Sequence, residues 1–264
     1  MRLENKVALI TGGGTGVGAA AARLFTREGA KVVVTGRRPE PIEAVAKETG
    51  AIAVAGDTSD PSHAAEAVTT AVENFGGLDI VVANAGIGID GTVGDMDLAD
   101  WHKQIDINLT GPMMMARAAI PAMLERGGGS VVLVASTNAL AAAPASAAYD
   151  ISKAGLLALA RAIAVDYGPR GIRANALCPG WIITPMGDES MDALAAERGL
   201  GGREDAYKFA SADVPLRRAG TAEEMAACCL FLASDESSIV TGTALIADGG
   251  GRAVELTSRM FASD

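Results

Sequence analysis

Short apolar runs rich in β-branched residues alternate with helical patterns along almost the whole chain of 264 residues. Runs with so few polar residues are typical of parallel strands that are covered on both faces. Successive strands separated by helices need crossover connections, and right-handed crossovers build a doubly wound sheet. Seven strands are predicted, at residues 7–10, 32–34, 52–54, 80–82, 131–134, 174–177 and 244–246. The pattern therefore predicts an α/β fold with a seven-stranded parallel sheet and helices on both faces.

Two helix starts carry clear capping signals. Asp60 is suited to be an N-cap, and Pro61 would be the first residue of a helix that runs through Phe75. The segment Thr221-Ala-Glu-Glu224 has the pattern of a capping box, in which two side chains satisfy the free backbone N–H groups reciprocally. It predicts a helix that runs through Leu232.

The chain shows no linker-like change of composition, so we predict a single domain over residues 1–264. Residues 186–215 break the alternation of strands and helices: this stretch is long, contains glycine and is partly helical in pattern. We expect a substrate loop there, since long insertions in compact domains are usually functional; a surface excursion is the alternative. A C-terminal tail is expected at about residues 252–264.

The overall charge and the first residues limit the partners. A formal net charge of −10 argues against nucleic acid or an anionic membrane as a partner. Residues 1–6 are charged and lead directly into a strand, which is not the pattern of a signal peptide. No uncharged stretch is long enough to span a bilayer. We therefore expect a cytoplasmic protein that binds a small molecule.

The cysteines and histidines give no metal or disulfide pattern. Cys178, Cys228 and Cys229 form no C-x-x-C pair, and all three are predicted to be small buried apolar residues. His63 and His102 are too few and too isolated for a metal site, and we expect both on helix surfaces. No metal is predicted.

A glycine-rich turn, Thr11-Gly-Gly-Gly-Thr-Gly-Val-Gly18, follows the first strand. Gly12, Gly16 and Gly18 would allow a tight turn, the close approach of a pyrophosphate, and close contact between helix and strand. A helix that starts near Gly16 would direct its N-terminal N–H groups at that anion. The spacing differs from the common G-x-G-x-x-G fingerprint, but the position predicts a dinucleotide cofactor and a Rossmann-like sheet.

The end of the second strand bears on the type of dinucleotide. Folds that bind NAD commonly place a carboxylate there for the ribose 2′-OH, but this strand ends Val34-Thr-Gly-Arg-Arg38. A guanidinium suits a 2′-phosphate, so Arg37 is predicted as the main contact, with Gly36 leaving room. Glu40 is expected to lie past the ribose. NADP(H) is therefore favoured; if both arginines are solvated loop charges instead, NAD(H) is possible.

Tyr149, Lys153 and Ser136 have a spacing that suits proton transfer. Tyr149 and Lys153 are four residues apart and would share a helix face, where the cation would lower the phenol pKa from its usual value near ~10. Ser136 ends an apolar run 13 residues before Tyr149 and could hold a substrate oxygen. These groups are what the interconversion of a carbinol and a carbonyl needs, with Tyr149 as general acid or base.

Taken together, these motifs resemble the short-chain dehydrogenase/reductase family over nearly the whole chain. The T-G-x-x-x-G-x-G turn, Asn84-Ala-Gly86, Asn108, Ser136, Tyr149/Lys153 and Pro179-Gly180 occur in the family's order and spacing. Ala83 is a departure, because many members have a second asparagine there. The resemblance implies an NAD(P)(H)-dependent oxidoreductase that interconverts a secondary alcohol and a ketone.

The resemblance also implies the roles of individual residues. The implied catalytic residues are Asn108, Ser136, Tyr149 and Lys153, with Asn108 positioning a water that carries protons toward Lys153. Lys153 would also bond the nicotinamide ribose, Asp57 the adenine, and Ile182 and Thr184 the carboxamide, while Asn84 would act through its backbone and support the central strand. The implied cofactor-binding residues are Gly12, Thr15, Gly16, Val17, Gly18, Gly36, Arg37, Asp57, Thr58, Asn84, Ala85, Gly86, Tyr149, Lys153, Pro179, Gly180, Ile182 and Thr184.

The substrate is less well defined by the sequence. The stretch of small residues at 139–148 is predicted to be a loop that leaves open volume beside the reacting carbon. Six residues could supply an apolar lid or could simply pack: Trp181, Met186, Met191, Leu194, Tyr207 and Phe209. We favour a medium-sized apolar or cyclic secondary alcohol or ketone.

Other functions remain open from the sequence. The alternatives are a 3-oxoacyl-thioester (acyl carrier protein) reductase and, further off, a non-catalytic cofactor-binding regulator. Resembling enoyl reductases usually have a longer gap between tyrosine and lysine, which disfavours enoyl reduction. In related proteins the helices that correspond to residues 101–123 and 147–167 form dimer faces, so the resemblance implies a homo-oligomer, either a tetramer or a dimer.

Overall fold

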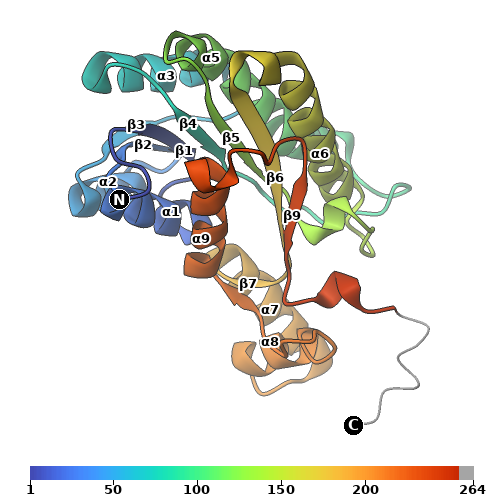
Figure 1. Cartoon of the computed structure of the whole chain (residues 1–264). Coiled ribbons are helices and arrows are strands. Elements are labelled where there is room, and N and C mark those ends of the chain that lie inside the picture. Colours follow the sequence, from blue (N-terminus) through green and yellow to red (C-terminus); the bar gives the residue numbers. More distant parts are fainter. Residues whose placement is uncertain (256–264) are drawn as a thin grey trace.

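A seven-stranded parallel sheet forms the centre of the protein in a computed structural model, which describes residues 1–255 (Figure 1). Its strand order is β3-β2-β1-β4-β5-β6-β9, so the order reverses between β1 and β4. The strands are β1 (Val7–Thr11), β2 (Lys31–Gly36), β3 (Ile52–Ala55), β4 (Ile80–Ala83), β5 (Gly129–Val134), β6 (Ile172–Pro179) and β9 (Ala244–Ala247). All seven predicted strands are present, and the predicted fold class is confirmed.

Helices cover both faces of the sheet (Figure 1). One face carries α1 (Gly16–Arg27), α2 (Pro39–Thr49) and α9 (Ala222–Ala233); the other carries α3 (Pro61–Phe75), α5 (Gly111–Glu125) and α6 (Ala147–Tyr167). Because successive side chains of a strand point to opposite faces, Leu9 packs into the α3–α5–α6 layer and its neighbour Ile10 into the α1–α2–α9 layer. The central strands β1, β4, β5 and β6 are therefore buried on both faces, which explains their apolar sequences, while the edge strands β3 and β9 are only partly buried.

The capping predictions are confirmed. The Asp60 carboxylate accepts a hydrogen bond from the Ser62 backbone N–H at 2.8 Å, and α3 runs from Pro61 to Phe75 as expected. Thr221 Oγ1 accepts from the Glu224 N–H at 3.2 Å, while Glu224 Oε2 accepts from the Thr221 N–H at 2.9 Å. Both halves of the capping box are therefore formed.

The helix predicted for residues 101–123 is not regular. It consists of α4 (Leu98–Ile105), a wide π-helical turn η1 (Asp106–Thr110) and α5. Wide turns of this kind accommodate one extra residue and change the direction of a side chain. Here the turn contains Asn108, whose amide bonds with the backbone of Ile87 in the loop after β4. A tertiary contact, which local propensity does not contain, therefore interrupts the helix.

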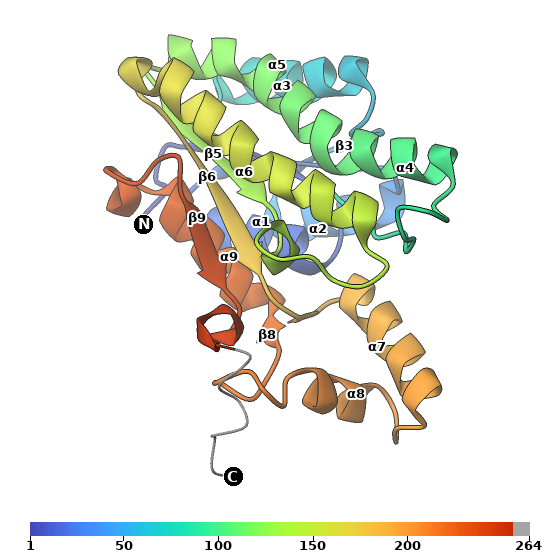
Figure 2. The same ribbon diagram turned by 90° about the vertical axis from the view of Figure 1, so that its right-hand side faces the viewer.

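The insertion predicted at residues 186–215 forms two helices, α7 (Pro185–Arg198) and α8 (Arg203–Ala210). They project from the carboxyl end of the sheet, near the start of α6 (Figure 2). A small parallel pair that was not predicted, β7 (Ile182–Ile183) and β8 (Gly220–Thr221), joins the base of the insertion. The insertion has a core of its own, formed by Met191, Ala195, Ala206, Tyr207 and Ala219.

His63 contradicts its prediction. It is only 3% exposed, whereas His102 is exposed as expected. The ring packs where Gly56 has no side chain: a Cβ at Gly56 would lie 2.1 Å from His63 Nδ1. Neither ring nitrogen has a hydrogen-bond partner in the described part of the chain, and burial lowers the pKa of the imidazole. Because Gly56 has no side chain, the His63 ring fits against it, and a position expected at a helix surface is buried.

The cysteine prediction holds for two of the three residues. Cys178 and Cys229 are buried, while Cys228 is half-buried, and all three are free thiols. Among residues 1–255, no group of three or more His, Cys, Asp and Glu side chains could hold a metal ion. Within the same residues, no helix combines the length and apolarity needed to cross a bilayer. Of the predicted tail, η5 (Gly251–Ala253) is formed, and residues 256–264 lie outside the described part.

One arginine joins the end of α9 to β6. Arg173 donates hydrogen bonds to Leu232 O at 2.9 Å, Ser234 O at 3.0 Å and Ser237 Oγ at 2.8 Å. Replacing Arg173 with Met should lower the free energy of unfolding by about 2 kcal/mol, because buried acceptors lose a charged donor. Urea unfolding at fixed protein concentration measures this change. The exposed Arg161→Met is the control, and equal denaturation midpoints for the two variants would contradict the assignment.

Candidate active site

Four predicted catalytic residues come from three elements that meet at the carboxyl edge of the sheet. Ser136 lies just beyond the end of β5, Tyr149 and Lys153 lie on the first turns of α6, and Asn108 lies in the wide turn before α5. Parallel strands end at a common edge, and the α6 crossover begins at that edge, so residues distant in sequence converge there.

The geometry brings these four residues together. The Ser136 side chain hydrogen-bonds with the Tyr149 phenol, and Lys153 Nζ lies 5.6 Å from the centroid of the Tyr149 ring. A Cβ placed on Gly86 would lie 3.3 Å from both Lys153 Nζ and Asn108 Oδ1. A hydroxyl, a phenol, an ammonium and an amide therefore lie close together, the last two directly beside Gly86.

Lys153 is a cation in an apolar setting. It is 4% exposed, and its Nζ donates to Val134 O at 2.9 Å. Burial lowers its pKa to about 8, and the nearby Cys178 thiolate form opposes that shift. The ammonium is thus charged at pH 7 but held in a place that penalises its charge.

The pKa of Tyr149 differs from the prediction. Burial raises it, the hydrogen bond with Ser136 lowers it, and the charge of Asp150 raises it, so that the pKa lies above its usual value. The expected lowering by Lys153 is absent in the chain alone, because Nζ donates to a main-chain carbonyl and not to the phenol oxygen. The phenol therefore holds its proton at neutral pH.

The amide of Asn108 is fully oriented by the protein. Its Oδ1 accepts from the Ile87 N–H at 2.8 Å, and its Nδ2 donates to Ile87 O at 2.9 Å and to Ser152 Oγ at 3.2 Å. Both N–H groups are therefore occupied. A second lone pair on Oδ1 remains, so the side chain has one acceptor position for a further contact.

The glycine turn is tightly built and fits a phosphate. Gly12 and Gly16 have φ angles of +64° and +52°, which glycine adopts without cost. A Cβ at Gly18 would lie 2.3 Å from Gly12 O, so α1 packs directly on the turn. The first turn of α1 leaves backbone N–H groups that suit an anion, and Gly12, Gly16 and Gly18 add no side chains of their own to the turn. Thr15 and Val17 lie at the N-cap and in the first turn of the same helix.

Asn84 holds this turn from the neighbouring strand. Its Nδ2 donates to Thr11 O at 3.0 Å and to Gly12 O at 3.3 Å, and the backbone N–H groups of Asn84 and Ala85 donate to Thr11 Oγ1. The side chain of Asn84 is thus used by the protein itself. Its backbone and that of Gly86 remain at the edge of the space.

The segment after β6 closes the same region from the other side. Thr184 caps α7 by accepting from the Gly187 N–H at 3.2 Å, and it lies against Gly16, whose Cβ would be 3.2 Å from Thr184 Cγ2. Pro179 ends β6, and Ile182 begins β7. Gly180 lies close to Asp248, where a Cβ would come within 2.9 Å of the Asp248 Cβ. The predicted pyrophosphate and carboxamide contacts are therefore adjacent.

An exposed guanidinium, that of Arg37, lies where the adenosine end of the cofactor is predicted to bind. Arg37 directly follows β2 and forms no ion pair with residues 1–255. Burial alone would raise the pKa of Asp57, but hydrogen bonds from Ser59 and the charge of Arg37 outweigh burial and lower it. Gly36 has little room, since a Cβ there would lie 3.0 Å from Ile42 Cγ2. Thr58 is buried and packs against the backbone of α5.

Sequence reasoning missed the residues that hold the β5–α6 loop (residues 135–146). Asp150 Oδ1 accepts from Asn138 Nδ2 at 2.7 Å, and Arg252 Nη2 donates to Thr137 O and Ala141 O at 3.2 Å. The sequence signal that could have revealed this contact is Asp150, an acidic residue directly after Tyr149 in an otherwise apolar helix start.

Of the predicted lid residues, Met191 and Tyr207 pack inside the insertion and Leu194 packs against its core, whereas Trp181, Met186 and Phe209 are exposed.

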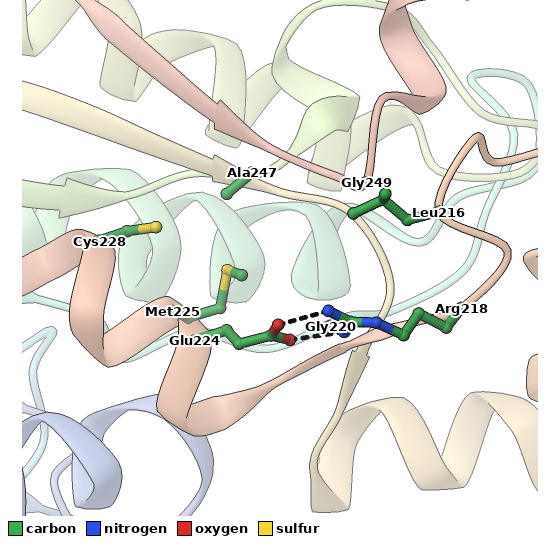
Figure 3. Close-up of a pocket in the computed structure, with 8 residues that line it drawn as sticks. All are labelled: Leu216, Arg218, Gly220, Glu224, Met225, Cys228, Ala247 and Gly249. Atoms are coloured by element: carbon green, nitrogen blue, oxygen red, sulfur yellow. Dashed lines mark hydrogen bonds and ion pairs between the residues drawn. The ribbon is translucent and has the colours of Figure 1, made fainter.

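A separate hollow of about 150 Å³ lies beside the start of α9 (Figure 3). Its wall includes Arg218 and Glu224, which form a bidentate ion pair at 2.8 and 2.6 Å, and the half-buried Cys228. The ion pair lowers the pKa of Glu224 to about 2. None of the predicted catalytic or cofactor residues lines this hollow, so it is distinct from the candidate active site.

Comparisons with known proteins agree with this arrangement. A family model described as enoyl-(acyl carrier protein) reductase matches residues 12–251. The protein MoaE of Klebsiella aerogenes is 40% identical (97% of this chain and 99% of that protein covered), and 2-(S)-hydroxypropyl-CoM dehydrogenase 3 of Xanthobacter autotrophicus is 38% identical (96% and 99%). The crystal structure of levodione reductase superimposes with a TM-score of 0.91 at 35% identity, covering 96% of this chain and all of that one.

The fold, the site and these matches define an oxidoreductase of the alcohol dehydrogenase/reductase type. The chain belongs to the short-chain dehydrogenase/reductase family, whose members use NAD(P)(H) and act on small molecules. The residues of the glycine turn and the space beside it fit such a dinucleotide.

The buried ammonium should make the site costly to the stability of the fold. The pKa of Lys153 is lower in the folded chain (about 8) than its ordinary value of 10.5, so the unfolded chain binds the proton more tightly. The cost is complete below pH 8 and disappears as the pH rises toward 10.5. Lys153→Met should therefore stabilise the cofactor-free protein at pH 7 by roughly 1–3 kcal/mol, and by less at pH 9.5.

Thermal unfolding at the two pH values measures this difference. Lys103→Met removes an exposed lysine on α4 and is the control, with no expected gain at either pH. A Lys153→Met variant that is less stable than the parent protein at pH 7 would show that the ammonium stabilises the fold.

Proposed function

We propose that the protein interconverts a secondary alcohol and a ketone, with NADP(H) preferred over NAD(H). The observation that carries this proposal is the convergence of Ser136, Tyr149 and Lys153 at the end of β5, with Asn108 behind them. A regulator that only binds a dinucleotide would have no chemical use for this cluster.

The chain's own residues supply proton transfer and orientation. When bound, the dinucleotide supplies or accepts the hydride. In reduction, the Tyr149 phenol donates its proton to the carbonyl oxygen, which Ser136 holds by a hydrogen bond. The raised pKa of Tyr149 suits this step, because the phenol is protonated at neutral pH. The Lys153 ammonium then stabilises the phenolate that is left. In oxidation the same phenolate takes the proton, so that direction is favoured at higher pH.

The substrate we favour is a medium-sized apolar or cyclic ketone or secondary alcohol. The β5–α6 loop has mostly small side chains, and exposed apolar residues of the insertion and its base, Trp181, Met186 and Phe209, are available to cover it. The names of two relatives, a levodione reductase and a 2-(S)-hydroxypropyl-CoM dehydrogenase, are of the same reaction class.

Acyl carrier protein chemistry is the second candidate, because the matching family model carries that description. A 3-oxoacyl thioester would use the same proton transfer from Tyr149. The net charge of −10 disfavours docking of an acidic carrier protein. A panel of cyclic ketones, 3-oxoacyl thioesters and enoyl thioesters, with each cofactor, distinguishes the candidates.

The proposal extends to the organisation of the protein. We propose a cytoplasmic, single-domain homo-oligomer, a dimer or tetramer, that uses the outer faces of α5 and α6. Exposed apolar side chains on these helices, Met113, Ile151 and Val165, support such a contact.

Tyr149→Phe removes the transferable proton and keeps the ring. The turnover number should fall by about two to four decades, in line with general acid–base contributions, while cofactor affinity stays within about threefold. Steady-state assays with the best ketone of the panel and fluorescence titration with NADPH measure the two quantities. Tyr167→Phe, at the other end of α6, is the matched control. Near-native turnover of Tyr149→Phe would overturn the proposed role.

Arg37→Ala tests the cofactor preference. The dissociation constant for NADPH should rise about 10- to 100-fold and that for NADH less than about threefold, because only the former has a phosphate for the guanidinium. Competing titrations give both constants, and Lys47→Ala on α2 controls for the loss of a nearby surface charge. Equal or tighter binding of NADH by the parent protein would refute the assignment to NADP(H).

A further inference from the structure

We propose that Asp150 is a positioning residue: it fixes the β5–α6 loop and, through Asn138, the orientation of the Ser136 hydroxyl. This inference rests on the proposed function and adds a residue outside the four that carry the chemistry. Asp150 is the residue next to Tyr149, so one turn of α6 would present the proton donor and orient its partner.

The contacts form a continuous path from carboxylate to hydroxyl. Asp150 Oδ1 accepts from Asn138 Nδ2 at 2.7 Å, and Oδ2 accepts from the Ala143 N–H at 2.9 Å. The backbone N–H of Asn138 in turn donates to Ser136 Oγ at 3.1 Å. That contact uses one lone pair of the hydroxyl oxygen, so the hydroxyl proton remains available to the Tyr149 phenol and, when a substrate is bound, to the substrate oxygen.

Both oxygens of the Asp150 carboxylate bond to this loop. Asp150 is 9% exposed, and no ion pair with a cation among residues 1–255 involves it. A buried charge needs hydrogen-bond partners, and the two known partners both come from the loop. Its place in the first turn of α6 also favours a negative charge, because the N-terminal end of a helix is positive.

The loop itself is held in a conformation that it would not adopt alone. Ala145 has a φ angle of +52°, in the left-handed region that non-glycine residues avoid. The loop is bonded to Gly91, whose N–H donates to Ala145 O at 2.7 Å. Such a conformation persists only where neighbouring contacts impose it, which agrees with a loop held from several sides.

Asp150 also acts on the phenol. Burial raises the pKa of Tyr149, and the Ser136 hydrogen bond lowers it. The negative charge of Asp150 is a third effect, which raises the pKa. The other charged or titratable groups facing this centre are Lys153 and, beside the lysine, Cys178. Removing the Asp150 charge would therefore move the phenol-dependent limb of the pH profile to lower pH.

Two substitutions separate these effects. Asp150→Ala removes both hydrogen bonds; we expect the turnover number and kcat/KM to fall together by about 10- to 100-fold, with cofactor affinity unchanged. Asp150→Asn removes the charge, but its Oδ1 can accept from Ala143, and its Nδ2 can donate to a rotated Asn138 amide. We expect this variant to keep turnover within about threefold and to lose reductase activity at lower pH than the parent protein.

Further variants test the path and serve as controls. Asn138→Ala should resemble Asp150→Ala, and the double variant should be no worse than either single one, because both interrupt the same path. Asp166→Asn removes an exposed carboxylate from the far end of α6 and should change neither turnover nor pH profile. Tyr149→Phe is assayed in parallel to test the proposed function separately.

The outcomes are distinct. If Tyr149→Phe is inactive but Asp150→Ala and Asn138→Ala turn over like Asp166→Asn, the positioning role is wrong and the proposed function stands. Additive losses in the double variant would also overturn it. If Asp150→Ala does not fold, by thermal unfolding, then Asn138→Ala decides: turnover like that of Asp166→Asn contradicts the proposal, and a loss of about 10- to 100-fold supports it. Active Tyr149→Phe would overturn the proposed function itself.

Discussion

The contact between β1 and β4 is the constraint on which the candidate site depends. The strand order reverses there, so the crossovers leave a crevice at the carboxyl ends of these two strands. Asn84 bonds to the carbonyls of Thr11 and Gly12 and so fixes the distance between the two strand ends. Gly18 brings α1 against the same turn, where any side chain would collide with Gly12 O. The packing of β1, β4 and α1 therefore shapes both the glycine turn, where the phosphates are predicted to bind, and the surroundings of Gly86.

Two buried charged groups, Lys153 and Asp150, lie three residues apart on α6, so they share one side of that helix. Neither has an ion-pair partner within residues 1–255, and each is held by uncharged groups: a main-chain carbonyl for the lysine, an amide and a backbone N–H for the aspartate. Burying charge in this way is costly unless every group is hydrogen-bonded. Of the two, Asp150 raises the pKa of the Tyr149 phenol, whereas Lys153 does not lower it, because its ammonium is bonded to Val134 O. In the proposed function, these two groups serve proton transfer and the positioning of Ser136.

The sequence predicted the elements whose signals are local. Strand positions followed from apolar runs, and the starts of α3 and α9 followed from Asp60 and from the Thr221–Glu224 capping box, because these signals lie within four residues. Predictions failed where a distant partner decides. His63 is buried because Gly56 leaves space for its ring, and the wide turn at Asn108 depends on the backbone of Ile87. The raised pKa of Tyr149 depends on burial, which spacing from Lys153 does not reveal.

We propose that the chemistry and the choice of substrate use separate parts of the fold. The proposed proton-transfer groups lie at the sheet edge and on α6, and these elements pack into the two main cores. The α7–α8 insertion instead has its own small core and its own charge network, in which Arg203 pairs with Asp188 and Asp192 and Tyr207 bonds to Asp188. Because it is packed independently, its outer residues can change without disturbing the reacting centre. In the proposed function, the insertion and the β5–α6 loop would therefore select the substrate, while the catalytic cluster would supply the reaction that the family shares.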